Sequence, residues 1–511
     1  MANKIDSNVT GLRYAEESSI KTLPGSPVWY PLEPNSYKDF GGQTTLMARN
    51  PINASRQRKK GVISDLDASG GFVQDLTQNN LTRMLQGFFF AAMREKATNL
   101  PLNGTAIPFS GVTGTTKTYT LGSGSIGTNF VAGDLVLMSG FSQSANNGLK
   151  NVASSTGATV VVSQTAVDET PSATAKVQKV GVQFGSAEFN IDVSTASYPR
   201  LLRASGTKDL TTLGLIPGEW VFIGGDSATT KFTTAGNNGF ARVRAVTATY
   251  IEFDKTAATM ANETGTGKTI QLFFGNVLRN EKDPTLITRR SYQLERTLGQ
   301  DANGTMSEYL VGAVPNELSL SIKQADKITA DLSFVAVDHE QRSGTTGVKS
   351  GTRPDNVDAP AFNTSSDFSR IKMHLITAGN TNPNPLFAFM TELEITINNN
   401  VSPNKAVAVL GAFDVSAGTF EVGGNITAYF ADIAAVQAVR NNADVALDLA
   451  VVKANAGLVF DIPLISLGDG RLNVEQDNPI TLPLSVEAAE SSFGYTLLLN
   501  EFPYLPNAAD V

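Results

Sequence analysis

The chain of 511 residues contains no cysteine and only two histidines and two tryptophans. Without cysteine there is no disulfide framework, no thiolate metal site and no cysteine nucleophile, so stability must come from packing or assembly. Lys and Arg number 40 against 48 Asp and Glu. The resulting net charge of −8 argues against a protein dedicated to binding duplex DNA, which needs a basic surface.

Long hydrophobic runs are also missing. The first ten residues lack the apolar core of a signal peptide, and the strongest apolar run is the short stretch from Phe88 to Met93. We therefore expect a soluble protein made in the cytoplasm that does not enter a membrane.

Most of the sequence alternates apolar residues with Thr, Ser or Asn and is interrupted by Gly and Asn, which predicts short strands and tight turns. Two helices are predicted against this background. The first runs from about Thr77 to Lys96, and the second from about Asp432, which is suited to capping, to Asn442. The helical spacing of the first assigns one buried face to Leu81, Met84, Leu85, Phe88, Phe89 and Ala92.

Two internal duplications are visible. In the first, Phe130 to Gly140 parallels Leu215 to Gly225, and Asn146 to Leu149 parallels Asn237 to Phe240. Each copy reads as a strand, a loop, an Asn-Gly turn and another strand. Residues 105–275 are therefore predicted to be an inserted β domain made of two small repeats.

The second duplication joins the two ends of the chain. Leu66 to Phe72 resembles Phe413 to Phe420, and the pair Leu318–Ile322 and Ile328–Leu332 resembles Leu472–Glu475 and Ile480–Leu484. We predict two copies of one module of β-strands with a single helix. Module one comprises residues 1–104 and 276–340, residues 341–365 form a linker or arm, and module two comprises residues 366–511.

Charge is unevenly distributed over this plan. Residues 368–511 carry six basic and fifteen acidic side chains, which is a net charge of −9. Module two therefore holds essentially all of the net negative charge, and we expect it to contribute an acidic surface.

Two glycine-rich stretches superficially match phosphate-binding loops. Glu263 to Thr269 lacks the first glycine of the motif because Asn262 occupies that position, and a strand-like stretch follows where a helix should begin. Gly122 to Gly127 matches GxGxxG but also precedes a strand, so no helix dipole awaits a phosphate. We interpret both stretches as turns.

No set of residues suited to catalysis or metal binding emerges. His339 and His374 are isolated from candidate partners, and Asp65 with Asp67 is explained by a hairpin turn. The basic run from Arg56 to Lys60 is interpreted as a solvated face or a contact with an acidic neighbouring subunit. We predict no enzymatic activity, no cofactor and no metal.

Several segments resemble the major tail tube proteins of long-tailed bacteriophages. The resembling segments are Tyr14–Ser18, Pro27–Leu32, Gly218–Asp226, Arg289–Arg296 and Val314–Leu320. The resemblance implies a mostly β fold of two tandem tail-tube-like sandwich or barrel modules, each with one flanking α-helix, plus the inserted β domain on the outer surface. Family members usually carry a single module, so the duplication is a departure from the common pattern.

The resemblance also implies a structural protein of the virion tail that polymerises into stacked rings around a conduit for double-stranded DNA, without binding it specifically. Two modules per chain favour three chains per ring with pseudo-sixfold symmetry. Expected partners are further copies of the chain and the tape measure, tail terminator and baseplate proteins. An alternative is another virion component, namely a tail terminator, baseplate hub or decoration protein.

The predicted hairpins suggest which side chains line the conduit. If Leu472, Val474, Leu482 and Leu484 face the core, the alternating residues face the other way. The resulting lumen candidates are Glu317, Ser319, Ser321, Asn473, Glu475 and Asp477.

Overall fold

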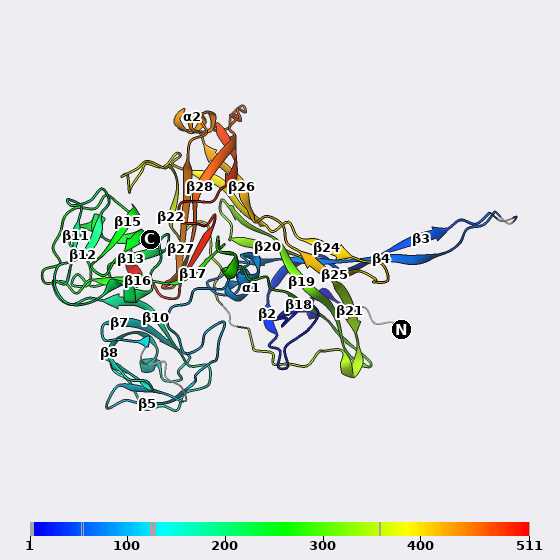
Figure 1. Cartoon of the computed structure of the whole chain (residues 1–511), viewed down its shortest axis with the longest axis horizontal. Coiled ribbons are helices and arrows are strands. Elements are labelled where there is room, and N and C mark those ends of the chain that lie inside the picture. The colour runs from blue at the N-terminus through cyan, green and yellow to red at the C-terminus, as the bar shows by residue number, and fades with distance from the viewer. Residues whose placement is uncertain (1–4, 53, 55, 123–128, 357–358, 510–511) are drawn as a thin grey trace.

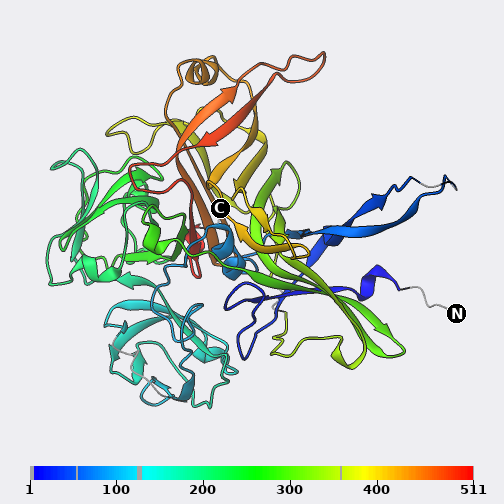
Figure 2. The same ribbon diagram turned by 45° about the vertical axis from the view of Figure 1, so that its right-hand side comes forward.

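The computed structural model describes residues 5–52, 54, 56–122, 129–356 and 359–509 (Figure 1). These residues form two large antiparallel sheets of 16 and 12 strands, a two-stranded ribbon of β24 (Ser402–Lys405) and β25 (Ala412–Ser416), and two short α-helices. Figure 2 shows that two lobes lie on one side of the molecule and that a long hairpin projects on the other side.

The 16-stranded sheet contains both modules. Its strands in module one are β1 (Gly11–Glu16), β2 (Tyr30–Leu32), β3 (Pro34–Arg49), β4 (Lys59–Asp75), β17 (Asn276–Arg279), β18 (Tyr292–Asp301), β19 (Gly304–Lys323), β20 (Thr329–Ala336) and β21 (Asp338–Arg342). Its strands in module two are β22 (Phe368–Leu375), β23 (Met390–Asn398), β26 (Glu421–Tyr429), β27 (Val445–Lys453), β28 (Ala456–Asp469), β29 (Thr481–Ala488) and β30 (Leu498–Phe502).

The two modules repeat the same strand order. In module one the order is β3-β4-β20-β19, with β18 on β19 and β1 on β18; in module two it is β23-β26-β29-β28, with β27 on β28 and β22 on β27. Both copies carry a register shift at the same place, between Pro34 and Ser36 and between Met390 and Glu392. The modules are joined into one sheet because β19 pairs with β23.

The sequence alignment of this duplication was correct for one pair of strands and wrong for another. Ile328–Leu332 and Ile480–Leu484 do occupy equivalent strands, β20 and β29. Leu66–Phe72 lies in β4, however, whose counterpart is β26 rather than the segment Phe413–Phe420, which spans β25 and the loop after it. Leu472 and Val474 follow the end of β28 and are 39% and 69% exposed, so the prediction that they face the core is wrong for the single chain.

Both predicted helices exist but are shorter than expected. Helix α1 spans Thr82–Phe88, and α2 spans Ala434–Arg440, with the Asp432 carboxylate accepting a hydrogen bond from the Ala434 amide. The first helix ends early because Phe90 adopts a left-handed backbone conformation with φ of 46°. Ala92, expected on the buried face, is exposed, whereas Met84, Leu85 and Phe88 are buried.

Strict alternation builds the core of the large sheet. Along β20, along β19 from Leu318 and along β23 from Leu393, every second side chain is buried, and these apolar residues form one cluster with the α1 side chains. Phe88 of α1 packs edge-on against Phe334 of β20, with ring centroids 5.4 Å apart. Helix α1 therefore covers the apolar face of the sheet and leaves the other face uncovered.

The inserted domain is a 12-stranded sheet with internal twofold repetition. Its strand order is β11-β12-β15-β14-β13-β16-β10-β7-β8-β9-β6-β5, in which each half reads as the other in reverse. The strands are β5 (Phe109–Thr113), β6 (Thr118–Leu121), β7 (Asp134–Ser139), β8 (Gly148–Ser155), β9 (Thr159–Val162), β10 (Lys176–Gln183), β11 (Phe189–Asp192), β12 (Arg200–Arg203), β13 (Trp220–Ile223), β14 (Gly239–Val246), β15 (Tyr250–Thr256) and β16 (Gln271–Phe274). The two repeats predicted from the sequence correspond to β7–β10 and β13–β16.

The insertion packs against module two although it is inserted into module one. Trp220, Phe222 and Phe240 share a buried cluster with Val459, Phe502 and other residues of module two. At the same interface Arg242 of β14, only 4% exposed, forms an ion pair with Asp461 of β28. Strand β30 lies between β17 and β28, so the C-terminal strand joins the exit of the insertion to module two.

The segment between the modules is fastened to module one. The Trp29 indole N–H donates to the Ser350 carbonyl at 3.0 Å, and Arg353 forms an ion pair with buried Glu295 at 2.7 Å. The described part of residues 341–365 therefore lies along module one as an ordered strap.

Candidate functional site: the polar face of the shared sheet

The face of the large sheet opposite α1 carries small polar and acidic side chains across both modules. One row of directly paired residues runs through seven consecutive strands from β4 to β28; it comprises Val73, Asp331, Ser319, Thr396, Gly423, Glu487 and Ser466. A neighbouring row comprises Asp75, Thr329, Ser321, Glu394, Asn425, Ser485 and Gly468. We call this surface the polar face.

Acidic residues outnumber basic ones on the polar face. Its acidic members in strands β19, β20, β23, β26 and β29 are Glu317, Asp331, Glu392, Glu394, Glu421 and Glu487. Two lysines stand among them, and both are paired: Lys38 with Asp331, and Lys323 with Glu392 at 3.2 Å. The Ser319 hydroxyl donates to Glu394 at 2.6 Å across the junction between the modules. The arrangement therefore offers a continuous hydrophilic surface with net negative charge.

The six lumen candidates from the sequence fall into two groups. Glu317, Ser319 and Ser321 lie on β19 and belong to the polar face. Asn473, Glu475 and Asp477 lie in the loop after β28, where all three are exposed and Asn473 forms an isolated bridge with Thr481. In the single chain the structure does not bring these two groups together.

Sequence reasoning missed the acidic residues of β23. The stretch Glu392-Leu393-Glu394-Ile395-Thr396-Ile397 alternates polar with apolar side chains, and the structure buries Leu393, Ile395 and Ile397. That alternation is the signal that identifies Glu392 and Glu394 as residues of the uncovered face.

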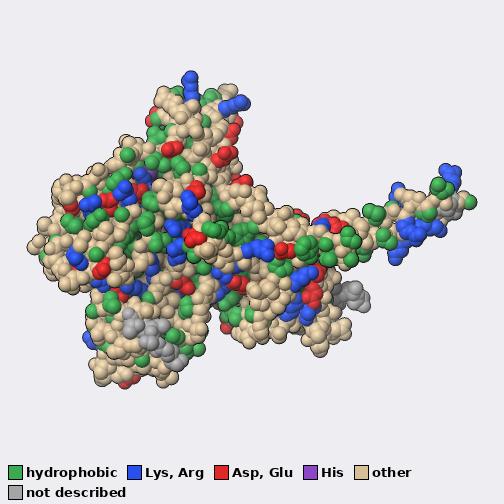
Figure 3. All heavy atoms as spheres, in the orientation of Figure 1, with side chains coloured by type: hydrophobic (Ala, Val, Ile, Leu, Met, Phe, Trp, Pro, Cys, Tyr) green, Lys and Arg blue, Asp and Glu red, His purple; other side chains and the backbone are tan. Residues whose placement is uncertain are grey.

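A second functional feature is the hairpin of β3 and β4, which extends well beyond the sheet (Figure 1). We call residues 43–66 the arm. The basic run predicted from the sequence lies near its tip, and Figure 3 shows basic side chains gathered there. The exposed basic residues are Arg49, Arg56, Arg58, Lys59 and Lys60, and the exposed apolar residues nearby are Leu46, Met47, Ile52, Val62 and Ile63.

The ribbon of β24 and β25 lies beside the base of the arm. Lys405 pairs with both Asp65 and Asp67, and these hydrogen bonds raise the pKa of Lys405 and lower the pKa of Asp65. The two aspartates considered as a cation site therefore hold a lysine instead.

The other candidates from the sequence are structural. The Glu263 carboxylate accepts hydrogen bonds from the Thr233 and Thr234 amides at 2.6 and 3.0 Å, and strand β16 follows, so this stretch is a turn rather than a phosphate loop. Glu169 makes the equivalent contacts with Ser142 and Gln143 in the other repeat. Residues 123–127 of the GxGxxG stretch lie outside the described residues.

Neither histidine is arranged for catalysis. His374 is fully buried beside Asp448, with Nδ1 3.4 Å from a carboxylate oxygen, and burial lowers its pKa to about 4. His339 lies in β21 with its ring against Gly42 of the arm's base. In the described ranges no group of three His, Asp or Glu side chains is placed to hold a metal ion.

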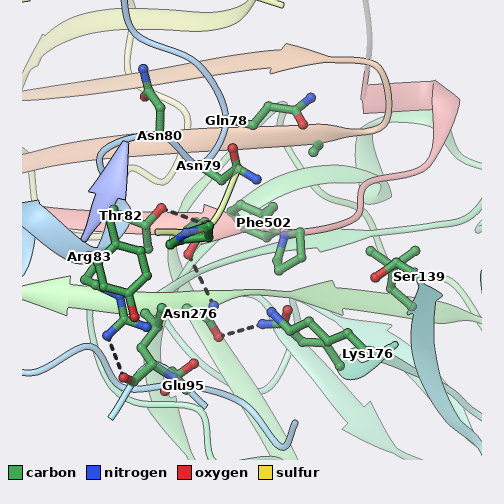
Figure 4. Close-up of a pocket in the computed structure, with 18 of the residues that line it drawn as sticks. Gln78, Asn79, Asn80, Thr82, Arg83, Glu95, Ser139, Lys176, Asn276 and Phe502 are labelled. Carbon is green, nitrogen blue, oxygen red and sulfur yellow. Dashed lines mark hydrogen bonds between the residues drawn. The ribbon is translucent and has the colours of Figure 1, made fainter. Parts of the chain in front are cut away.

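A cavity of about 570 Å³ lies where module one, the insertion and module two meet (Figure 4). Glu501 of β30 accepts hydrogen bonds from Thr82 and Asn276 at 3.1 and 3.2 Å, and burial raises its pKa. Arg83 lies over the Tyr30 ring and donates to the Leu102 carbonyl. The bonds from Thr82 and Asn276 to Glu501 therefore join module one to module two across this cavity.

The fold defines a class of protein: a subunit with a duplicated β module, a hydrophilic sheet face and a projecting hairpin. Comparison with family models then identifies the family. Residues 7–250 and 186–488 both match the model described as phage tail tube protein, and the chain belongs to this family. Two overlapping matches in one chain agree with the duplicated module.

No curated protein matches the chain at a significant level. Among the described residues, no helix combines the length and hydrophobicity needed to span a membrane. Family membership makes the protein a structural component of the phage tail, as the sequence analysis expected.

Proposed function

We propose that three copies of this chain close into a ring, that the rings stack into the tail tube, and that the polar face lines the channel through which DNA passes. The observation that carries this proposal is the junction between β19 and β23. It joins two modules edge to edge through seven consecutive residue pairs, from Glu317 opposite Asn398 to Lys323 opposite Glu392. Repeating this junction between copies extends the sheet around a ring of six modules.

The charge of the polar face supports a channel for DNA. The six carboxylates of β19, β20, β23, β26 and β29, together with Asp75 of β4, outnumber the two paired lysines and leave each chain with net negative charge on this face. An acidic wall repels the phosphate backbone and does not replace the counterions condensed on DNA, so no free energy is gained by binding and the DNA is not retained. The small Ser, Thr, Gly and Asn side chains between the carboxylates offer the bases no aromatic surface for stacking.

The placement of the insertion supports an outer location. The chain enters the insertion shortly after α1, which packs on the apolar face of the sheet. The insertion therefore leaves from the side opposite the polar face, where it does not obstruct the channel.

The arm supports contact between stacked rings. It extends beyond its own sheet and combines exposed basic and apolar side chains, whereas module two carries a net charge of −9 in residues 368–511. An arm that reaches the module two surface of the next ring satisfies both its charge and its apolar side chains. The tape measure, terminator and baseplate proteins are the expected partners inside and at the two ends of such a tube.

Electron microscopy with symmetry analysis tests the proposal on the purified protein or on the phage particle. The expected result is hollow stacked rings with three chains each. A ring of six chains would contradict the proposed stoichiometry, and a protein that stays monomeric under all conditions would favour a terminator, baseplate hub or decoration protein.

Charge reversal tests the channel separately. In the phage, replacing Glu394, Glu421 and Glu487 by lysine turns the net charge of the polar face positive without altering the apolar face. We expect normal tubes and slower genome ejection, with a salt dependence that the parent lacks. Replacing the same residues by glutamine is the matched control, and an unchanged ejection rate for the lysine variant would refute the lining role.

A further inference from the structure

The duplication makes it possible to derive which residues face each other between copies. This step rests on the proposed ring. Two strand edges, one in each module, have no partner strand in the described part of the chain. Their counterparts in the other module pair with each other at the junction inside the chain.

The first unpaired edge is β3. Its residues pair with β4 on one side, and the described strands place nothing on the other. Its counterpart in module two is β23, because Tyr37 and Leu393 occupy equivalent positions: Tyr37 lies opposite Phe72, and Leu393 lies opposite Ile426. Unlike β3, strand β23 has both edges paired, one with β26 and one with β19.

The second unpaired edge is the chain that follows β28. In module one the last residues of β19 are held from both sides, since Ser321 lies opposite Thr329 of β20 and opposite Glu394 of β23. In module two the equivalent residue is Asn473, which lies opposite Thr481, the counterpart of Thr329. Asn473 is held from that one side only, and the segment is not a regular strand.

Exposure shows that this segment is incomplete in the single chain. Leu320 and Ile322 are 4% and 7% exposed, because β23 and the core of module two lie against them. Their counterparts Leu472 and Val474 are 39% and 69% exposed. An apolar pair at alternate positions of an edge segment is what a strand presents when its covering neighbour is absent.

We propose that residues 471–475 become the continuation of β28 in the ring and that residues 473–475 pair antiparallel with residues 36–38 of a second copy. The junction inside the chain sets the register. Because Ile322 lies opposite Leu393, Val474 lies opposite Tyr37 of the second copy. Asn473 then lies opposite Lys38, and Glu475 opposite Ser36.

In this register, Glu475 takes the position in the junction between copies that Lys323 takes in the junction inside the chain, so the charge at this position is reversed. Inside the chain, module one contributes Lys323 and module two contributes Glu392, which form an ion pair at 3.2 Å. Between copies, module two contributes Glu475, and module one contributes Lys38 one diagonal position away, within reach of its long side chain. The register also returns Asn473 and Glu475 to the polar face, on which the sequence analysis had placed them.

Because the chain contains no cysteine, disulfide trapping reports this contact without background. Directly opposed residues of an antiparallel pair have Cα atoms about 4.5–5.5 Å apart, which a disulfide spans, whereas a shift of two residues places them about 7–8 Å apart. The test variant carries Val474→Cys and Tyr37→Cys. The matched control carries Leu472→Cys and Tyr37→Cys, which keeps both residues on the same face but shifts the register.

Both variants are assembled under reducing conditions, imaged by electron microscopy, oxidised and analysed on denaturing gels without reductant. We expect covalent trimers from the test variant and roughly tenfold less cross-linking from the control. The pair Asn473→Cys and Lys38→Cys examines the same register from the polar face, so the experiment does not depend on one variant assembling.

The possible failures are distinguishable. If the parent chain forms no rings, the proposed function itself fails. If tubes form but neither in-register pair cross-links, or the shifted pair cross-links better, the proposed register is overturned while the ring remains. Covalent hexamers would support the register and contradict three chains per ring.

Discussion

Removing the Arg242 guanidinium should detach the insertion from module two at a large cost in stability. Arg242 reaches both oxygens of Asp461 at 3.0 and 3.1 Å and contacts Asp254 at 2.7 Å. Asp461 is fully buried, and its remaining partner at this interface is the Tyr495 hydroxyl at 2.8 Å. In Arg242→Met a buried carboxylate loses its counter-charge, which costs about 3–5 kcal/mol in the free energy of unfolding.

The pH dependence of this loss has a definite sign. Burial already raises the pKa of Asp461 to about 6 while Arg242 opposes that rise, so removing Arg242 raises the pKa further. Above that pKa the folded variant holds an uncompensated charge, and below it the carboxyl is protonated. The loss should therefore be largest near pH 8 and smaller near pH 5.

Urea unfolding at both pH values, followed by the fluorescence of Trp220 in the same interface, measures the effect. Arg244→Met is the matched control, since Arg244 lies two residues along β14 with its side chain 45% exposed and pairs with Glu252. Glu252 is only 5% exposed but keeps a second ion pair, with Arg200 at 2.8 Å, so removing the partly exposed Arg244 should cost only about 0–1 kcal/mol. The reasoning is refuted if Arg242→Met and Arg244→Met lower the stability equally, or if the loss for Arg242→Met is greater at pH 5 than at pH 8.

Three further predictions concern other parts of the chain. Burial lowers the pKa of His374 in the folded state to about 4, so the unfolded chain binds a proton at this residue more readily than the folded chain. His374 therefore does not affect the free energy of unfolding above about pH 6.5 and lowers it as the pH falls towards 4. Replacing it in His374→Gln should flatten the acid side of the curve of unfolding free energy against pH. Replacing Arg58, Lys59 and Lys60 of the arm by glutamate should leave rings that do not stack in electron micrographs, whereas Lys282→Glu, at an exposed site away from the arm, should stack normally. Gly424→Ala should destabilise the chain by roughly 2 kcal/mol or more in urea, because its Cβ would lie 1.9 Å from the Glu394 carbonyl, whereas Gly25→Ala meets nothing within 4 Å and should be neutral.

The mostly β fold, the helix in each module and the repeats of the insertion could be predicted from the sequence because they depend on local periodicity and on self-similarity at short offsets. The pairing of β19 with β23 could not. It brings together residues 69 to 81 positions apart, and no local pattern specifies which edge strand meets which. The alignment of the modules failed at Phe413–Phe420 for a related reason, since local similarity of side chains does not show that this segment lies in the separate ribbon of β24 and β25 rather than in the large sheet.

The candidate site was half predictable. Glu317, Ser319 and Ser321 could be identified because alternation in β19 assigns polar residues to one face. For Asn473 and Glu475 alternation alone is insufficient, because in the single chain no neighbouring strand turns this segment into sheet. The lengths of both helices were overestimated because the periodic pattern continues into turns, where the left-handed conformation of Phe90 redirects the chain.

The junction between β19 and β23 has a consequence for how assembly begins. In a ring of six modules made from three chains, every second junction between modules is the β19–β23 pairing, which already forms when the chain folds. The two modules at that junction stay in contact at any protein concentration, because they belong to the same chain. Completing a ring of three chains then needs two encounters between independent molecules, because the third junction between copies closes within the assembled trimer. Six separate modules would need five such encounters, each of which loses translational and rotational freedom. In the proposed ring, the presence of two modules in one chain thus lowers the subunit concentration at which the first ring can form. It also lets the two halves of the chain differ, as in the arm at the end of β3 and β4, which has no counterpart among the described strands of module two.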